Sequence, residues 1–323
     1  MAFRYIAGFA ACVIFPALAS AAWGPDRNVE IVVTTGPGGA QDRTARTMQG
    51  ILQQRQMVAV PITVINKPGA GGVLGLVYMN QHLRDGHYLL TTSPTLLANH
   101  IVGISTLTYT DVTPIAQLFS EYVGFAVRAD SPIKSARDLI ESVKKDPSAI
   151  SAAISTSSGN HNHIAIGLVM KAAGVDLKRL KVVVFKGSSE SVTAALGGHV
   201  DFLATTASNL VQLAADGKMR VLAMAAPSRL AGPMANVPTW RELGINAIGN
   251  NWRAVAGPKG MTAAQVEYWE DVLARLVATS EWKEDVERNL WVGNFMRSAE
   301  CAAEYKRGYM ELKGVLTELG LAK

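Results

Sequence analysis

Between residues 29 and 226, short apolar segments rich in β-branched residues alternate with segments whose apolar residues recur at helical spacing. Strands that are apolar on both faces need cover on both faces, so this alternation predicts an α/β fold of parallel sheets between layers of helices. The expected strands are 29–35, 62–66, 88–92, 149–155, 181–185, 200–206 and 220–226. The expected helices are 44–56, 72–83, 135–145, 164–173, 188–196 and 209–216.

Two more strand-like segments, 122–128 and 252–256, are each followed by a turn that contains proline. After the second of them, only helices are expected, over 262–279, 281–290 and 299–319. The simplest topology lets these two segments cross between two α/β units and form a hinge. The prediction is a discontinuous domain 1 at 22–123 plus 252–323, and a domain 2 at 124–251.

The first residues have the pattern of a secretory signal peptide. Arg4 precedes an apolar run over 5–18, and the small residues Ala19, Ser20 and Ala21 follow it. The run is too short to span a bilayer comfortably, and no later stretch is long and apolar enough. We therefore expect export, with residues 1–21 removed. Cys301 is then the one cysteine left, so no intramolecular disulfide is expected.

The charge pattern argues against a nucleic-acid partner. The chain has 31 Lys and Arg against 26 Asp and Glu, a net charge of +5, and these residues are scattered among one another. No basic block interleaved with aromatic residues stands out. A mild positive charge of this kind would help an anionic small molecule to approach.

Two glycine-rich loops follow the first two expected strands and precede helices. Residues 36–42 read Gly-Pro-Gly-Gly-Ala-Gln-Asp, and residues 66–72 read Asn-Lys-Pro-Gly-Ala-Gly-Gly. Exposed backbone N–H groups and the positive end of a helix dipole make such loops anion sites. The first loop lacks the spacing of a phosphate-binding or dinucleotide-binding motif. Asp42 could cap its helix, contact a ligand, or do both. The ligand-binding candidates here are Pro37, Gly38, Gly39, Asp42, Ala70, Gly71 and Gly72.

The second unit has polar residues in the same positions, after strands and before helices. Hydroxyl and amide side chains in these loops could orient a carboxylate. Ser188 is expected to be a helix N-cap. The pair His161 and His163 lacks a third ligand with clear spacing, so no metal or other cofactor is expected, and His163 is expected to pack and hydrogen-bond at the helix start. The candidates here are Ser157, Ser158, Asn160, His163, Lys186, Gly187 and Thr205.

An enzyme is not expected. The sequence has no G-x-S-x-G elbow, and the Ser142-x-x-Lys145 match lies in a polar helix. Cys301 has no histidine near it in the sequence. No ordered set of nucleophile, base and orienting group stands out.

These motifs together resemble the substrate-binding proteins of tripartite tricarboxylate transporters, also called the Bug family. The resemblance covers nearly the whole mature chain. It rests on 37–42 with Ala45-Arg46 behind it, on 66–72, on Asp-Gly-His-Tyr-Leu-Leu at 85–90, and on Leu-Gly-Gly-His-Val-Asp at 196–201. The chain departs from the family pattern at Ser157, Asn160, Phe185 and Met261.

The resemblance implies a two-domain periplasmic-binding-protein (Venus flytrap, type II) fold with a hinge of two crossing segments. It implies a periplasmic receptor that captures a small carboxylate, such as a di- or tricarboxylate or a related organic acid. By resemblance, the first-domain loops grip one carboxylate through backbone donors and ordered water, and the second-domain loops contact the rest. The implied partners are the membrane permease subunits of a tripartite transporter. A monomer is expected. The alternatives are a ligand-sensing module of a two-component sensor and, less favoured, a periplasmic hydrolase.

Overall fold

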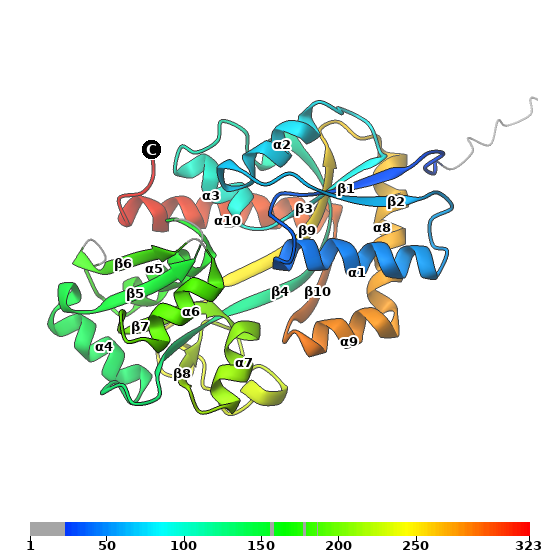
Figure 1. Cartoon of the computed structure of the whole chain (residues 1–323). Coiled ribbons are helices and arrows are strands. Elements are labelled where there is room, and N and C mark those ends of the chain that lie inside the picture. Colours follow the sequence, from blue (N-terminus) through cyan, green and yellow to red (C-terminus); the bar gives the residue numbers. More distant parts are fainter. Residues whose placement is uncertain (1–22, 156–157, 177–178, 186) are drawn as a thin grey trace, which may run out of the picture.

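The computed structural model describes residues 23–155, 158–176, 179–185 and 187–323. The expected signal peptide and the candidates Ser157 and Lys186 lie outside the described residues. Figure 1 shows two lobes joined by two long strands, β4 (Val112–Arg128) and β9 (Asn250–Pro258).

The sheet of the first lobe has the order β2-β1-β3-β9-β4. Its strands β1 (Val29–Val33), β2 (Ile62–Asn66) and β3 (Tyr88–Thr92) are parallel, whereas β9 pairs antiparallel with both β3 and β4. The expected parallel pairing is confirmed for β1, β2 and β3, and β9 adds an antiparallel strand where the chain returns to this lobe against the direction of β3.

Helices cover both faces of this sheet. They are α1 (Ala40–Gln54), α2 (Val73–Asn80), α3 (Thr95–Ile101), α8 (Ala263–Ala278), α9 (Ser280–Arg288) and α10 (Ser298–Glu318). The core on one face joins Met48 and Leu52 of α1 to Trp269 and Leu273 of α8, all fully buried. Burial of this apolar surface is what holds the helices on the sheet.

The second lobe repeats the arrangement. Its strands are β5 (Ser151–Ser155), β6 (Lys181–Phe185), β7 (Phe202–Thr206) and β8 (Met219–Met224). Strand β5 lies parallel to β6 and β7, while β7 and β8 pair antiparallel with the end of β4. The covering helices are α4 (Ala136–Lys145), α5 (His161–Ala172), α6 (Ser188–Leu196) and α7 (Ala207–Ala215).

Three elements differ from the sequence expectation. Strand β4 begins at Val112 rather than at 122, and its polar residues Gln117, Ser120 and Glu121 interrupt the apolar pattern that would have revealed it. Strand β10 (Val292–Arg297) lies where only helices were expected, and pairs antiparallel with β4. Helix α3 has only 7 residues, which is too short for a periodic signal.

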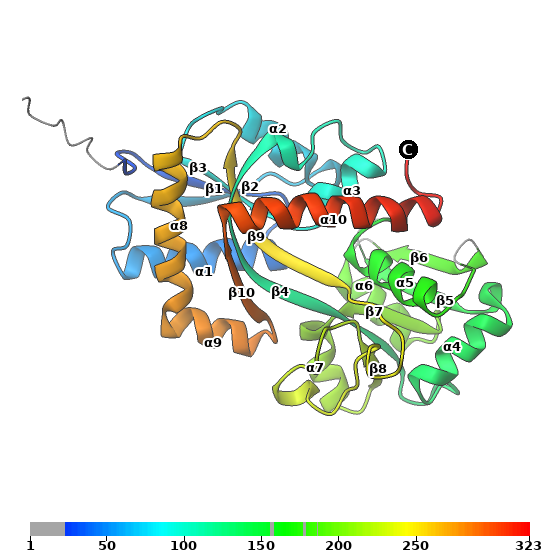
Figure 2. The ribbon, with the colours of Figure 1, turned by 180° about the vertical axis from the view of Figure 1, so that it is seen from behind.

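Helix α10 reaches from the first lobe across to the second (Figure 2). Its last turns pack on α5, where Leu316 and Leu319 share an apolar cluster with Ile164 and Leu168. Lys171 of α5 also lies 2.6 Å from Glu318, an exposed ion pair that adds little stability. The apolar contact is therefore one connection between the lobes besides the two strands.

Replacing Gly167 should weaken this contact. A Cβ at Gly167 would lie 3.0 Å from Leu319 Cδ1 and 3.2 Å from Val315 Cγ1. Overpacking of this kind costs about 1–3 kcal/mol, so Gly167→Leu should lower the free energy of unfolding by that amount in denaturant titrations. Gly314→Ala, on an open stretch of α10 with no atom within 4 Å, is the control and should be neutral or stabilising. Equal stability of Gly167→Leu and the native chain would contradict this packing.

Candidate functional site

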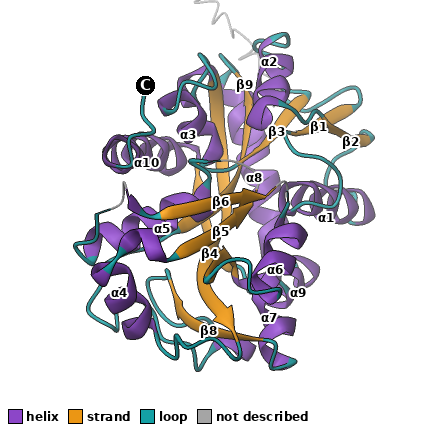
Figure 3. Ribbon diagram, turned by 60° about the vertical axis from the view of Figure 1, so that its left-hand side comes forward, coloured by secondary structure: helices purple, strands orange, loops and turns teal. Residues whose placement is uncertain are grey.

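The parallel strands of the two lobes end at one place, the middle of the β4–β9 ladder. Thr92 at the end of β3 pairs with Ala254 of β9, which in turn pairs with Gln117 of β4. Thr206 at the end of β7 pairs with Val123 of β4. The loops that follow the strands of one lobe therefore face those of the other across residues 118–122. In Figure 3 the arrowheads of β5 and β6 point toward the lobe that holds α1. In α/β proteins, ligands bind at such carboxyl ends.

Asp42 organises the two loops of the first lobe. It lies in the first turn of α1 and is 3 % exposed. Its Oδ2 accepts hydrogen bonds from the Gly38 N–H at 2.9 Å and from Arg46 Nε at 3.0 Å. Its Oδ1 accepts one from Asn66 Nδ2 at 2.9 Å, and Asn66 begins the second loop. Both carboxylate oxygens are thus engaged within the chain, and Asp42 holds the loops in place.

These hydrogen bonds also set the charge of Asp42. Burial alone would raise its pKa, but the hydrogen bonds from Arg46, Gly38 and Asn66 outweigh burial and hold the pKa below its ordinary value of 3.8. Asp42 is therefore a carboxylate at neutral pH.

The second loop turns back against the first. Ala70, Gly71 and Gly72 have positive φ angles of 46°, 65° and 100°. A Cβ at Gly72 would lie 3.0 Å from the Thr34 Cβ, so only glycine fits there. Asn99 Nδ2 donates to the Gly71 carbonyl at 2.9 Å, which ties the loop to α3. Pro37, Gly38, Gly39, Ala70 and Gly71 are exposed. The structure thus brings the seven first-lobe candidates together, with Asp42 buried among them.

In the second lobe, Asn160 is a helix cap. It is 3 % exposed, and its Oδ1 accepts a hydrogen bond from the His163 N–H at 3.0 Å. Its Nδ2 donates to the Ser155 carbonyl. His163 Nδ1 accepts from the Gly159 N–H at 3.0 Å, and burial lowers the pKa of His163 to about 4. The expectation that His163 packs and hydrogen-bonds at the helix start is confirmed.

The remaining described candidates of this lobe lie at neighbouring strand ends. Ser158 is exposed, and Gly187 is the N-cap of α6, so the expectation that Ser188 caps this helix is wrong by one residue. Ser188 Oγ lies 3.4 Å from Ser155 Oγ, which links the start of α6 to the end of β5. Thr205 is 1 % exposed and its Oγ1 accepts from Asn209 Nδ2 at 2.9 Å. The backbone and Ser158 are therefore more available to a ligand than the Thr205 or Asn160 side chains.

Sequence reasoning missed a polar cluster beneath these loops, formed by Glu121, Asn251 and Arg253 on the crossing strands. Arg253 Nη2 lies 3.1 Å from Glu121 Oε2. The available signal was an acidic residue in one crossing strand and a basic residue in the other. Their pairing depends on the register of β4 and β9, which the sequence alone does not show.

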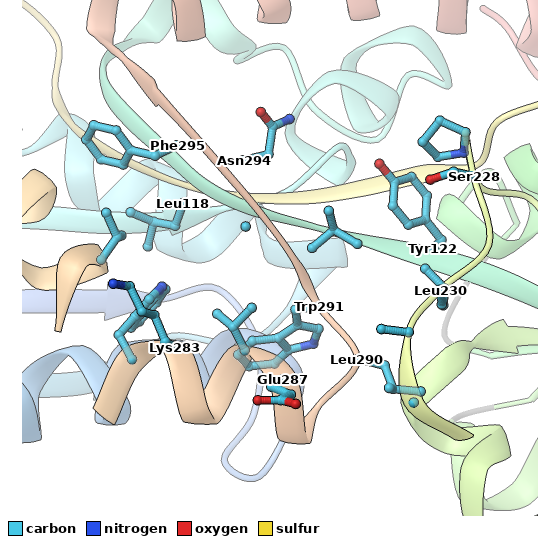
Figure 4. Close-up of a pocket in the computed structure, with 18 of the residues that line it drawn as sticks. Leu118, Tyr122, Ser228, Leu230, Lys283, Glu287, Leu290, Trp291, Asn294 and Phe295 are labelled. Carbon is cyan, nitrogen blue, oxygen red and sulfur yellow. The ribbon is translucent and has the colours of Figure 1, made fainter. Parts of the chain in front are cut away.

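A cavity of about 770 Å³ lies between β4, α9, β10 and the loop 227–233. Figure 4 shows Leu118 and Phe295 toward one end of it and Tyr122 and Leu230 toward the other. Tyr122 lines this cavity while Glu121 belongs to the polar cluster, because successive side chains of a strand point to opposite faces. None of the candidate ligand-binding residues lines it.

Within the described ranges, no group of three or more His, Cys, Asp and Glu side chains could hold a metal ion. Cys301 is fully buried, and burial raises the pKa of its thiol to about 12. In the same ranges, no helix is both long and apolar enough to cross a bilayer.

A family model described as the tripartite tricarboxylate transporter family receptor matches residues 45–290. The chain belongs to this family. Receptors of the family are periplasmic solute-binding proteins. The expected family membership is thereby confirmed.

Relatives of known sequence agree with this membership. The chain is 28% identical over 309 residues to the UPF0065 protein in the gbd 5' region of Cupriavidus necator, covering 95% of this chain and 92% of that protein. It is 28% identical over 243 residues to the protein BugT of Bordetella pertussis, covering 73% of this chain and 72% of BugT.

Solved structures of the family share the fold. The periplasmic binding protein BugD superposes with a TM-score of 0.76 at 24% identity, covering 93% of this chain and 99% of BugD. Rhodopseudomonas palustris Rpa4515 with adipate gives a TM-score of 0.80 at 21% identity, covering 92% of this chain and 99% of Rpa4515. The expected two-domain α/β receptor fold is confirmed.

Asp42→Asn tests the role of Asp42 as the organiser of the loops. The substitution removes the carboxylate that three donors share, so it should cost about 1–3 kcal/mol of unfolding free energy at pH 7. Because the folded pKa of Asp42 lies below 3.8, this stability is fully present above pH 3.8 and is lost as the pH falls through the folded pKa. Urea titrations should therefore show a difference between variant and native protein that narrows below about pH 4. If the stability difference between the variant and the native protein does not change with pH, Asp42 does not organise the loops through its charge.

Proposed function

We propose that this receptor captures a small carboxylate, such as a di- or tricarboxylate or a related organic acid, and delivers it to the membrane permease of a tripartite tricarboxylate-type transporter. The observation that supports this most is the meeting of strand ends from both lobes at the β4–β9 ladder. The proposal includes removal of residues 1–21 on export, action as a monomer and the absence of a catalytic role.

The first lobe supplies backbone donors for the carboxylate. A helix leaves its first N–H groups without intrahelical partners, and α1 begins at Ala40, directly after Gly38 and Gly39. The second loop adds an exposed turn at Ala70 and Gly71, which leaves backbone groups accessible at the carboxyl end of β2. Hydrogen bonds to a charged group contribute about 1.5–3 kcal/mol each. A few of them, after ordering costs, are enough for micromolar affinity.

Closure of the two lobes would complete the site. Residues of β4 up to Tyr122 pair with β9, whereas those from Val123 onward pair with β7. This change of partners supports a hinge near 123 and 252, and with it the division into 22–123 plus 252–323 and 124–251. A ligand that touches both lobes stabilises the closed state, because only that state offers both sets of contacts.

Two structures of similar fold carry acids that fit this proposal. R. palustris Rpa4515 was solved with adipate, and MatC of the same organism was solved with malate. Both ligands are small carboxylates. At 21% and 22% identity, these structures share only the fold with this chain. The proposed ligand class therefore rests on the loops of this chain.

A thermal-shift screen of mono-, di- and tricarboxylates and amino acids, followed by calorimetry, tests the proposal. An acid at about 100 times its dissociation constant adds roughly 2.7 kcal/mol to stability, which is readily seen as a higher Tm. The absence of any stabilising acid would contradict it.

Ser158→Ala tests the site with the acid found by that screen. Ser158 is exposed, and the proposal assigns it to the ligand site, so its loss should weaken binding several-fold and leave the Tm of the ligand-free protein unchanged. Ser142→Ala on α4 of the same lobe is the matched control and should bind like the native chain. If Ser158→Ala and Ser142→Ala bind the acid with equal affinity, Ser158 is not part of the ligand site.

A further inference from the structure

The ion pair of Glu121 and Arg253 lies at the floor of the proposed cleft. Arg253 follows Trp252 on β9 and pairs with Phe119 of β4, between the ends of β3 and β7. Glu121 is 1 % exposed and Arg253 is 5 % exposed. A buried charge of this kind persists only when a partner compensates it.

Glu121 and Arg253 compensate each other closely. Arg253 Nη2 lies 3.1 Å from Glu121 Oε2, and the same Oε2 accepts from Asn251 Nδ2 at 3.2 Å. Asn251 Oδ1 accepts from Arg253 Nη1 at 2.6 Å. The three side chains thus form a closed ring of hydrogen bonds whose net charge is zero.

Two helix starts of the second lobe lie near this ring. Ser208, in the first turn of α7, donates to Glu121 Oε1 at 3.2 Å. His161, the first residue of α5, is partly exposed. Partial burial, followed by the charge of Arg253, lowers the pKa of His161 below its ordinary value of 6.5, so the imidazole is uncharged at neutral pH. The floor therefore combines residues of both lobes and adds no net charge.

A second carboxylate at this floor would gain little. Any anion that approaches Arg253 also approaches Glu121, so attraction and repulsion nearly cancel while the cost of desolvating the anion remains. An amide, hydroxyl or carbonyl group is cheaper to desolvate. It can bond to the neutral imidazole of His161, which offers one donor and one acceptor. Arg253 Nε is a buried donor that, among the described residues, has no acceptor.

We propose that the Glu121–Arg253 pair makes this receptor selective for acids with one carboxylate and an uncharged hydrogen-bonding group at the far end. The inference rests on the proposed function, since the first-lobe loops must hold the carboxylate. In this arrangement the loops and helix N-termini of the first lobe bind the charged end. The floor, with His161 and Ser208 above it, then rejects a second charge.

Calorimetry of the native protein with matched acids tests the selectivity. The probes are succinate, glutarate and adipate, each compared with its half-amide, in which one carboxylate is replaced by a carboxamide of nearly the same shape. The half-amide of the best-fitting chain length should bind about tenfold or more tightly than its diacid. Tighter or equal binding of the diacid would overturn the inference and leave the proposed function standing. If neither the diacids nor the half-amides bind, both the inference and the proposed function are overturned.

Glu121→Gln gives an independent test. The variant keeps the shape of the side chain but leaves the Arg253 charge uncompensated, so a diacid can now supply the missing anion. Compared with the native protein, the variant should bind the diacid more tightly relative to the half-amide. The diacid should also raise the Tm of the variant more than the half-amide does. A variant that keeps the native preference would overturn the inference.

The double variant Glu121→Leu, Arg253→Met covers the case in which Glu121→Gln does not fold. Replacing both partners of a buried ion pair with apolar residues of similar size is often tolerated. Its floor is again uncharged, so it should still disfavour the diacid, while the half-amide loses part of its affinity. Tight binding of the diacid by this variant would contradict the assigned role of the pair.

Discussion

The antiparallel ladder between β4 and β9 is the constraint on which the rest of the structure depends. Both strands run through the middle of the molecule, and their register places the ends of β3 and β7 on opposite sides of residues 118–122. Because parallel strands end where their following loops begin, this register turns two separate sets of loops into one candidate site. The same two strands carry the chain from the first lobe to the second and back, and they form the proposed hinge.

In each lobe, buried polar side chains hold the loops in place. Asp42 joins the two glycine-rich loops, and Asn160 caps α5. The groups left for a ligand are then mostly backbone N–H groups and the exposed hydroxyl of Ser158. In the proposed function such groups recognise an anion through fixed dipoles. The proposed selectivity then comes from the Glu121–Arg253 pair.

The sequence predicted the strands and helices that carry strong periodicity, and the loops at 36–42 and 66–72 that join them. It did not predict the first half of β4, since Gln117, Ser120 and Glu121 interrupt the apolar pattern there. Asp42 could be assigned to the first turn of a helix, but not to a bond with Asn66, which lies 24 residues away. Contacts of this kind depend on register, which a single sequence does not contain.

Lobe closure is the central claim, and a distance between the lobes tests it most directly. Spin labels at Gln54→Cys on α1 and Glu141→Cys on α4 would occupy exposed positions in opposite lobes, while the native Cys301 is fully buried. Pulsed electron resonance should show a distribution that shortens and narrows when the stabilising acid is added. An unchanged distribution at saturating acid would contradict the account of a receptor that closes on its ligand.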